Sequence, residues 1–179
     1  MSESDAIVIR ILDDAEAWQR AEALGDVLID CVEGGASVSF MAPLARERAL
    51  AFWRGVADGV AAGERLLLVA EDEISGEILG TVQVVFAHQE NQPHRGEIAK
   101  MLVRRSARRR GIGGALMRAA ERAALTAGKC LLVLDTTTGS DAARLYERLG
   151  WTRVGDIPGY ALWPEGGLCA TTYYFKPLG

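Results

Sequence analysis

The stretch from residue 97 to residue 135 constrains the fold more than any other part of the chain. Residues 97–103 have a strand pattern, and a glycine-rich turn separates them from apolar residues that recur at helical spacing up to Gly128. Another apolar strand pattern begins at Cys130. A connection of this length joins two parallel strands. The turn is therefore expected at the carboxyl end of the first strand, where open α/β sheets bind ligands.

The turn, Val103 to Gly114, predicts a site for a phosphate-bearing ligand. Its glycines let the backbone approach a ligand closely, and the helix that follows offers unpaired amides and a positive dipole end. Arginines at positions 108–110 add positive charge at the same place.

The spacing of this turn excludes two common phosphate loops. A dinucleotide fingerprint that starts at Gly111 needs a third glycine where the chain has Leu116. A Walker loop that ends in Gly128-Lys129 needs a hydroxyl residue where the chain has Cys130. The pattern that remains is R-x-x-G-x-G.

The first half of the chain predicts alternating strands and helices. Residues 7–12 fit a strand, and Asp13 or Asp14 is expected to cap one helix. A second helix is expected between Pro43 and Gly63, followed by an antiparallel hairpin of residues 65–70 and 78–86. The residues expected on the inner face of the first helix are Trp18, Ala21, Leu24 and Leu28.

The last part of the chain predicts a short helix and two strands. Ser140 is expected to cap the helix, which ends near Gly150. The strands are expected at residues 152–157 and 169–176, with a loop at 158–168 that partly covers a pocket.

Composition indicates one globular domain, residues 1–179. A chain of 179 residues with 49% hydrophobic and 25% charged residues suits a single core. The net charge of −4 argues against general nucleic-acid binding, so the arginine cluster is interpreted as a local anion site.

Cysteine and histidine usage predicts neither a disulfide framework nor a metal site. The three cysteines are widely spaced, and His88 and His94 are isolated. The polar N-terminal residues and the lack of a long apolar run predict no signal segment and no membrane contact. We therefore expect a cytoplasmic protein.

The motif formed by Arg108, Gly111 and Gly113 resembles the acyl-coenzyme A signature of the GNAT family of N-acetyltransferases. The expected element order, β-α-α-β-β-β-α-β-α-β-β, also resembles that of the family. The resemblance implies an α/β fold with a mixed, mostly antiparallel sheet, in which a central parallel strand pair splays around acetyl-CoA and helices flank the sheet. Residues 34–38 and 158–160 are similar to those of the tabtoxin-resistance acetyltransferases within this family, which implies an amino-acid-like acceptor.

Three side chains are candidates for the chemistry. Acetyl transfer to an ammonium requires a base, because alkyl ammonium groups titrate near pH 10. Glu97 begins the strand before the turn, where a carboxylate is costly unless it is used or paired, and Asp135 ends the parallel strand. The resemblance implies that they form a proton-handling pair, although Asp135 also suits a role in ordering the threonine-rich loop after it. Tyr146 matches the family pattern Y-x-x-x-G-W and is implied as the general acid, although its helical spacing alone fits a core aromatic.

The resemblance also implies the binding residues. The amide of Leu102 is implied as the oxyanion donor, and Ser140 stands where many members have asparagine. The residues expected to bind acetyl-CoA are Met101, Leu102, Val103, Arg108, Arg109, Arg110, Gly111, Ile112, Gly113, Gly114 and Ser140. The residues expected at the amine pocket are Ser37, Phe40, Met41, Tyr160 and Trp163.

The expected function is an acetyl-CoA-dependent N-acetyltransferase that acts on a small-molecule amine by direct attack. It is expected to work as a monomer or homodimer, without metal, nucleic acid or membrane. Two alternatives stay open: a peptide or protein N-acetyltransferase of the same fold, and an acyl-CoA-binding module without catalysis.

Overall fold

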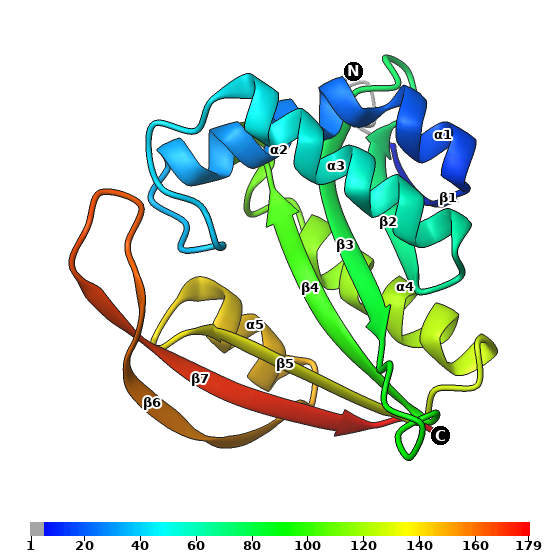
Figure 1. Ribbon diagram of the computed structural model, residues 1–179, viewed down its shortest axis with the longest axis vertical. Coiled ribbons are helices and arrows are strands. Elements are labelled where there is room, and N and C mark those ends of the chain that lie inside the picture. Colours follow the sequence, from blue (N-terminus) through cyan, green and yellow to red (C-terminus); the bar gives the residue numbers. More distant parts are fainter. Residues whose placement is uncertain (1–5) are drawn as a thin grey trace.

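A single seven-stranded sheet organises the described part of the chain, and helices cover both of its faces (Figure 1). The computed structural model describes residues 6–179. In chain order the elements are β1 (Ile7–Leu12), α1 (Asp14–Gln19), α2 (Ala21–Glu33), α3 (Arg46–Ala61), β2 (Arg65–Asp72), β3 (Ile78–Phe86), β4 (Arg95–Val103), the 3₁₀ turn η1 (Arg105–Ala107), α4 (Ile112–Thr126), β5 (Leu131–Thr137), α5 (Asp141–Arg148), β6 (Thr152–Leu162) and β7 (Leu168–Pro177).

The strand order is β1-β2-β3-β4-β5-β7-β6, and β4 with β5 is the parallel pair. The other neighbours run antiparallel. Helix α4 is the crossover between the parallel strands, which confirms the expected fold class.

The parallel pair separates soon after it begins. Its register runs only from Arg95↔Leu131 to Glu97↔Val133, although β4 continues to Val103 and β5 to Thr137. Figure 1 shows the two strands diverging toward their carboxyl ends. The middle of the sheet therefore opens into a V.

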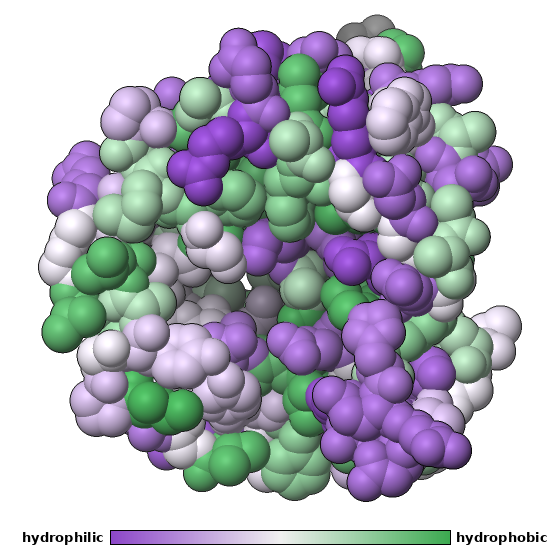
Figure 2. Space-filling model, in the orientation of Figure 1, coloured by the Kyte–Doolittle hydropathy of each residue, from purple (hydrophilic) through white to green (hydrophobic). Residues whose placement is uncertain are grey.

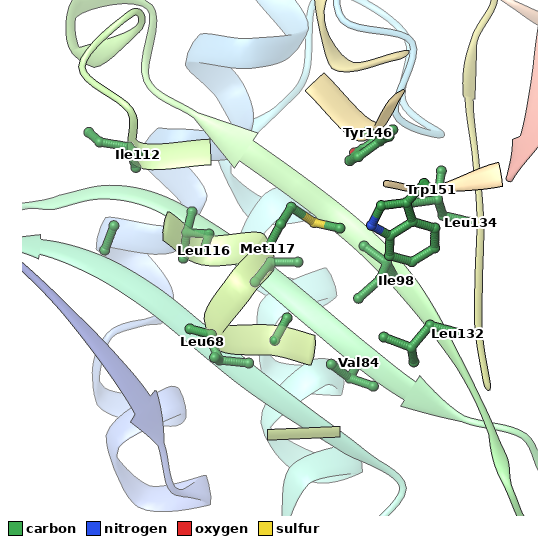
Figure 3. Packing of buried hydrophobic residues seen from close by; sticks show 14 of the residues in the cluster. Leu68, Val84, Ile98, Ile112, Leu116, Met117, Leu132, Leu134, Tyr146 and Trp151 are labelled. Carbon is green, nitrogen blue, oxygen red and sulfur yellow. The ribbon is translucent and has the colours of Figure 1, made fainter. Parts of the chain in front are cut away.

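Two apolar clusters hold the helices on the sheet. Helices α2 and α3 pack on one face around Trp53, which is 0% exposed. Helices α4 and α5 pack on the other face, where Figure 3 shows Trp151 beside Ile98 and Leu134. Full burial of each large apolar side chain contributes roughly 1.5–3 kcal/mol, so both faces support the strands that form the V.

The N-terminal helical segment differs from the expectation of one continuous helix. Asp13 forms a capping box with Glu16, and α1 ends at Gln19, because Arg20 has a φ of −92° and a ψ of 5° and interrupts the helix. The Arg20 guanidinium forms an ion pair of 2.9 Å with the buried Glu71 of β2. Because the chain breaks there, Trp18 does not share the inner face of α2. It is 51% exposed and lies under the guanidinium of Arg54.

The expected covering loop at residues 158–168 is also wrong. Strand β6 runs through this region to Leu162 and pairs with β7 as Ala161↔Cys169 and Leu162↔Leu168. The proline and glycine at 158 and 159 lie at a register shift of an edge strand, not at the end of a strand. The region is therefore a β-hairpin with its turn at residues 163–167.

Among residues 6–179, no helix is both long enough and apolar enough to cross a membrane.

Candidate active site

The glycine-rich turn presents backbone amides at the open end of β4. Gly111 precedes α4 with a φ of +79°, a conformation that glycine adopts without strain. In the part of the chain that the structure describes, no side chain caps this helix start. The first amides of α4 therefore remain available to an anionic ligand.

Gly113 brings the first turn of α4 close to β4 and α5. A Cβ atom at this position would lie 3.1 Å from Leu145 Cδ2 and 3.7 Å from Met101 Sδ. A larger side chain would therefore fill the space between the helix start and the end of β4.

The arginines of the turn divide into two groups. Arg104 donates to the Ile78 carbonyl over 2.8 Å, and Arg105 donates from Nε to Asp30 over 2.8 Å, so both hold the turn to its neighbours. The arginines at 108–110 are exposed. The second group is the part of the cluster that faces solvent beside the helix start.

Glu97 and Asp135 lie on the same face of the opened sheet. Glu97 is opposite Val133 in the parallel register, and Asp135 follows Val133 by two residues, so alternation along the strand places all three on one face. Helices α2 and α3 cover this same face further along the sheet. Ala99, two residues after Glu97, is opposite Gln83, which is opposite Leu67, and Leu67 belongs to the cluster under α2 and α3.

Glu97 is exposed, and within residues 6–179 its carboxylate has no hydrogen bond or ion pair. A surface hollow of about 130 Å³ borders it, lined by residues 85–89 and by Arg95. Asp135 instead lies 2.7 Å from the Thr171 hydroxyl, which also lies 2.9 Å from the Thr136 carbonyl oxygen. The two carboxylates therefore differ, because Asp135 is held by its neighbour and Glu97 is not.

Tyr173 of β7 joins this face, because it is opposite Asp135 in the register. Its hydroxyl is 2.8 Å from that of Tyr160 on β6. This hydrogen bond and burial raise the pKa of Tyr173. Tyr173 therefore keeps its proton at neutral pH, on the face that also carries Asp135.

The Lys100 side chain points to the same face, toward the space between β4, β7 and segment 34–45 that we call the cleft. Strand β4 bulges between Ala99 and Leu102, and Lys100 has a φ of +47° there. Its ammonium donates to Ser39 Oγ over 3.1 Å and lies 5.7 Å from the centre of the Phe52 ring. Burial lowers the pKa of Lys100, while the charges of Asp135 and Glu97 act in the opposite direction.

Tyr146 lies on the other side of the opened sheet. It is 4% exposed and packs against Trp151 and Tyr174 in the cluster under α4 (Figure 3). Burial, followed by the charge of Asp135, raises the pKa of Tyr146. The phenol therefore keeps its proton at neutral pH.

The residues expected at the amine pocket come from two segments that meet in space. Ser37 donates to the Leu162 carbonyl over 2.8 Å, and the Ala42 amide donates to the Pro164 carbonyl over 2.9 Å. Segment 34–45 thus contacts the β6–β7 hairpin. Figure 2 shows the surface hollowed between this contact, β4 and β7.

The other expected pocket residues differ in their surroundings. Phe40 packs edge-on against Phe52 with ring centres 5.3 Å apart, which indicates a role in packing. Met41, Tyr160 and Trp163 are 41%, 47% and 41% exposed. The three exposed side chains are accessible to an acceptor, and their roles stay predictions.

Ser140 caps the start of α5, as its position in the sequence predicts. Its Oγ accepts from the Ala143 amide over 3.1 Å and lies 3.4 Å from Thr136 Oγ1. A contact between Ser140 and acetyl-CoA stays a prediction.

Sequence reasoning missed Lys100, Ser39 and Tyr173. A lysine inside a strand pattern reads as an ordinary solvent-facing residue, and the bulge that turns it into the cleft leaves no signal in the sequence. Tyr173 follows from the register of β5 with β7, which requires the strand order.

Comparison with known proteins decides the family. Residues 63–153 match the family model described as an acetyltransferase (GNAT) domain. The chain belongs to the GNAT acetyltransferase family. The protein is therefore an acetyltransferase, and its acetyl donor is acetyl-CoA.

Solved structures share the fold over almost the whole chain. An N-acetyltransferase from Staphylococcus aureus Mu50 has 17% identity and a TM-score of 0.80, over 97% of this chain and 99% of that chain. A putative acetyltransferase from Salmonella typhimurium, solved with its cofactor acetyl-CoA, has 20% identity and a TM-score of 0.77, over 97% and 95%. A ribosomal-protein-alanine N-acetyltransferase from Brucella melitensis has 22% identity and a TM-score of 0.79, over 96% and 99%.

Proposed function

We propose that this GNAT acetyltransferase transfers acetyl to the amine of a small molecule by direct attack. The observation that carries the proposal is that the candidate proton acceptors and the candidate proton donor lie on opposite faces of the sheet. Glu97 and Asp135 lie on one face of the opened sheet, and Tyr146 lies on the other. A proton acceptor and a proton donor are thus separated by the gap between β4 and β5.

The described residues fit acetyl-CoA. Residues 98–103 of β4 have no partner in β5, so their backbone groups on that side are available to an extended ligand. The uncapped start of α4 and the exposed arginines at 108–110 suit its phosphates. When bound, acetyl-CoA supplies the acetyl group as an activated thioester.

Glu97 is the favoured base. Its carboxylate has no partner in the part of the chain that the structure describes, so it is free to accept the ammonium proton directly or through a water molecule. Asp135, held by Thr171, adds negative charge that attracts the ammonium. In this arrangement Asp135 orients the acceptor and Glu97 takes its proton.

Tyr146 Oη supplies a proton on the opposite face. Its raised pKa keeps the phenol protonated before the reaction, so Oη has a proton to donate to the thiolate as it leaves. The same burial serves core packing, so activity measurements are needed to separate the two roles.

The contact between segment 34–45 and the β6–β7 hairpin supports a small acceptor. The bonds from Ser37 and Ala42 connect the two segments across one end of the hollow. A long peptide needs an open groove at this position. We infer an amino-acid-like acceptor, such as tabtoxinine-β-lactam, from the sequence similarity of residues 34–38 and 158–160 to tabtoxin-resistance acetyltransferases.

Proteins of this fold are named for different acceptor classes. One neighbour of 22% identity is named as acting on ribosomal-protein alanine, and another of 19% identity is named a putative phosphinothricin N-acetyltransferase.

The test is thiol release from acetyl-CoA by the purified protein with a panel of tabtoxinine-β-lactam, phosphinothricin, amino acids, polyamines, aminoglycosides and short peptides. Turnover of a small amine, with short peptides inactive, is expected. Turnover of peptides alone would refute the small-molecule proposal. Binding of acetyl-CoA with no transfer to any amine would favour a binding module without catalysis.

A further inference from the structure

The proposed acetyl transfer assigns no role to Lys100, although its ammonium lies in the cleft wall near the carboxylates of Glu97 and Asp135. Lys100 is half-buried, and its described contacts are the Ser39 hydroxyl and the Phe52 ring. Glu97 and Asp135 both act on its charge. A cation in this position repels an ammonium acceptor unless it has an anion of its own to bind.

The backbone is strained at both ends of the Lys100–Ser39 hydrogen bond. Lys100 has a φ of +47°, and Ser39 has a φ of +78°. Each such conformation costs on the order of 1–3 kcal/mol for a residue other than glycine, and residues of this kind cluster at binding sites. The rest of the fold therefore holds these two side chains together against a local cost.

An ion pair with another described residue does not account for the position of Lys100. Within residues 6–179 no carboxylate lies in ion-pair range of its ammonium. An ammonium has three N–H donors, and Ser39 accepts from it. Donors thus remain for a ligand, and the Ser39 hydroxyl is free to donate its own proton to the same ligand.

We propose that Lys100 and Ser39 bind an acidic group of the acceptor. The inference rests on the proposed acetyl transfer and specifies its substrate class: an amine that carries a carboxylate or a similar anion, as an amino acid does. Glu97 and Asp135 face the ammonium of this acceptor, and Lys100 faces its anion. The cleft is then complementary to a zwitterion and opposes polyamines and aminoglycosides, which lack an anion.

The experiment compares acceptors with and without the anion, each in the wild type and in a variant, so that the lower amine pKa of a carboxamide cancels in the ratio. Thiol release is measured with L-leucine, L-methionine and L-glutamine, and with the carboxamide of each, for the wild type and for Lys100→Met. Removal of a charge-assisted hydrogen bond should lower kcat/KM for the amino acids by about 10- to 100-fold, mostly through KM. The carboxamides should change by less than about threefold, because they have no anion to lose.

Lys129→Met is the matched control. Lys129 also lies over an aromatic ring, 4.5 Å from the centre of Phe86, and donates to one oxygen, the Pro93 carbonyl, over 2.7 Å. The Phe86 ring packs against the cluster under α4, on the opposite face of the sheet from Glu97, so substitution of Lys129 should leave the ratio between amino acids and carboxamides unchanged. Ser39→Ala should move the ratio in the same direction as Lys100→Met, and keeps the test valid if the lysine variant does not fold.

Several results would overturn the inference. An equal loss of activity on both acceptor sets in Lys100→Met and Ser39→Ala would overturn it, and so would a wild type that acetylates other amines and none of the amino acids. Acetylation of Lys100 itself, found by mass spectrometry with the acceptor ratio unchanged, would make it an acetyl acceptor instead. Failure of the wild type to bind acetyl-CoA in calorimetry would overturn the acetyl transfer as well, and that result separates the two failures.

Discussion

Replacement of Glu97 by glutamine tests the base in the most direct way. The side chain is exposed and without a described partner, and the amide has the same shape, so the free energy of unfolding should change by less than about 0.5 kcal/mol. Any large loss of turnover then reports on chemistry. At pH 7 about one in a thousand alkyl amines is neutral, and a general base contributes roughly 10²–10⁴-fold. Because Glu97 is open to water, we expect the lower end, about 100-fold in kcat, or about 2.7 kcal/mol of barrier.

The pH dependence gives the decisive readout. Without a base, the variant depends on amine that is already neutral, so its kcat should rise about tenfold per pH unit. The wild type should stay nearly flat once the carboxylate is ionised. The gap should therefore shrink from about 100-fold at pH 7 to near equality at pH 9. The assay is steady-state thiol release from pH 6 to pH 10 with saturating acetyl-CoA.

Asp135→Asn is measured over the same pH range as Glu97→Gln, to compare the two carboxylates. Since Thr171 already holds Asp135, its loss should raise KM for the amine more than it lowers kcat. A wild-type rate and pH profile in Glu97→Gln would refute the reasoning. A pH-dependent loss confined to Asp135→Asn would transfer the role of base to that residue.

Three further substitutions test other parts of the structure. Tyr146→Phe should slow transfer by about 10- to 100-fold in single-turnover kinetics while thermal unfolding stays nearly unchanged, and an unaltered rate would leave Tyr146 as a core aromatic. Gly113→Asp should weaken acetyl-CoA binding in calorimetry by more than tenfold, because the new side chain meets Leu145 and adds like charge near the phosphates, and full affinity would mean that the phosphates bind elsewhere. Trp53→Ala should lower the free energy of unfolding by about 3–5 kcal/mol in urea titrations, and a loss below about 1 kcal/mol would contradict the packing of α3.

The sequence was sufficient for the elements with strong periodicity. The turn between β4 and α4, the crossover and the hairpin of β2 and β3 each depend on local patterns, and the structure has them close to the expected bounds. The parallel pair placed Glu97 and Asp135 on one face because alternation along paired strands is a local rule.

The parts that were wrong or missed depend on tertiary contacts. The helix breaks at Arg20, which forms an ion pair with Glu71 of β2. Because of this break, the residues of α1 that face the sheet differ from those expected for one continuous helix. Continuation of β6 past residue 158 depends on pairing with β7. The bulge that turns Lys100 toward Ser39 is a mismatch between β3 and β4, which the sequence of β4 alone does not reveal.

The bonds from Ser37 and Ala42 to the β6–β7 hairpin also bear on how acceptor preference can change. Ser37 and Leu162 are 125 residues apart in the sequence, yet the two segments supply hydrogen-bond partners to each other. A substitution in one segment that moves its backbone leaves the carbonyls of Leu162 and Pro164 without their donors. Altered specificity therefore requires matched changes in both segments. A library that varies one segment at a time will mostly sample variants in which these hydrogen bonds are lost.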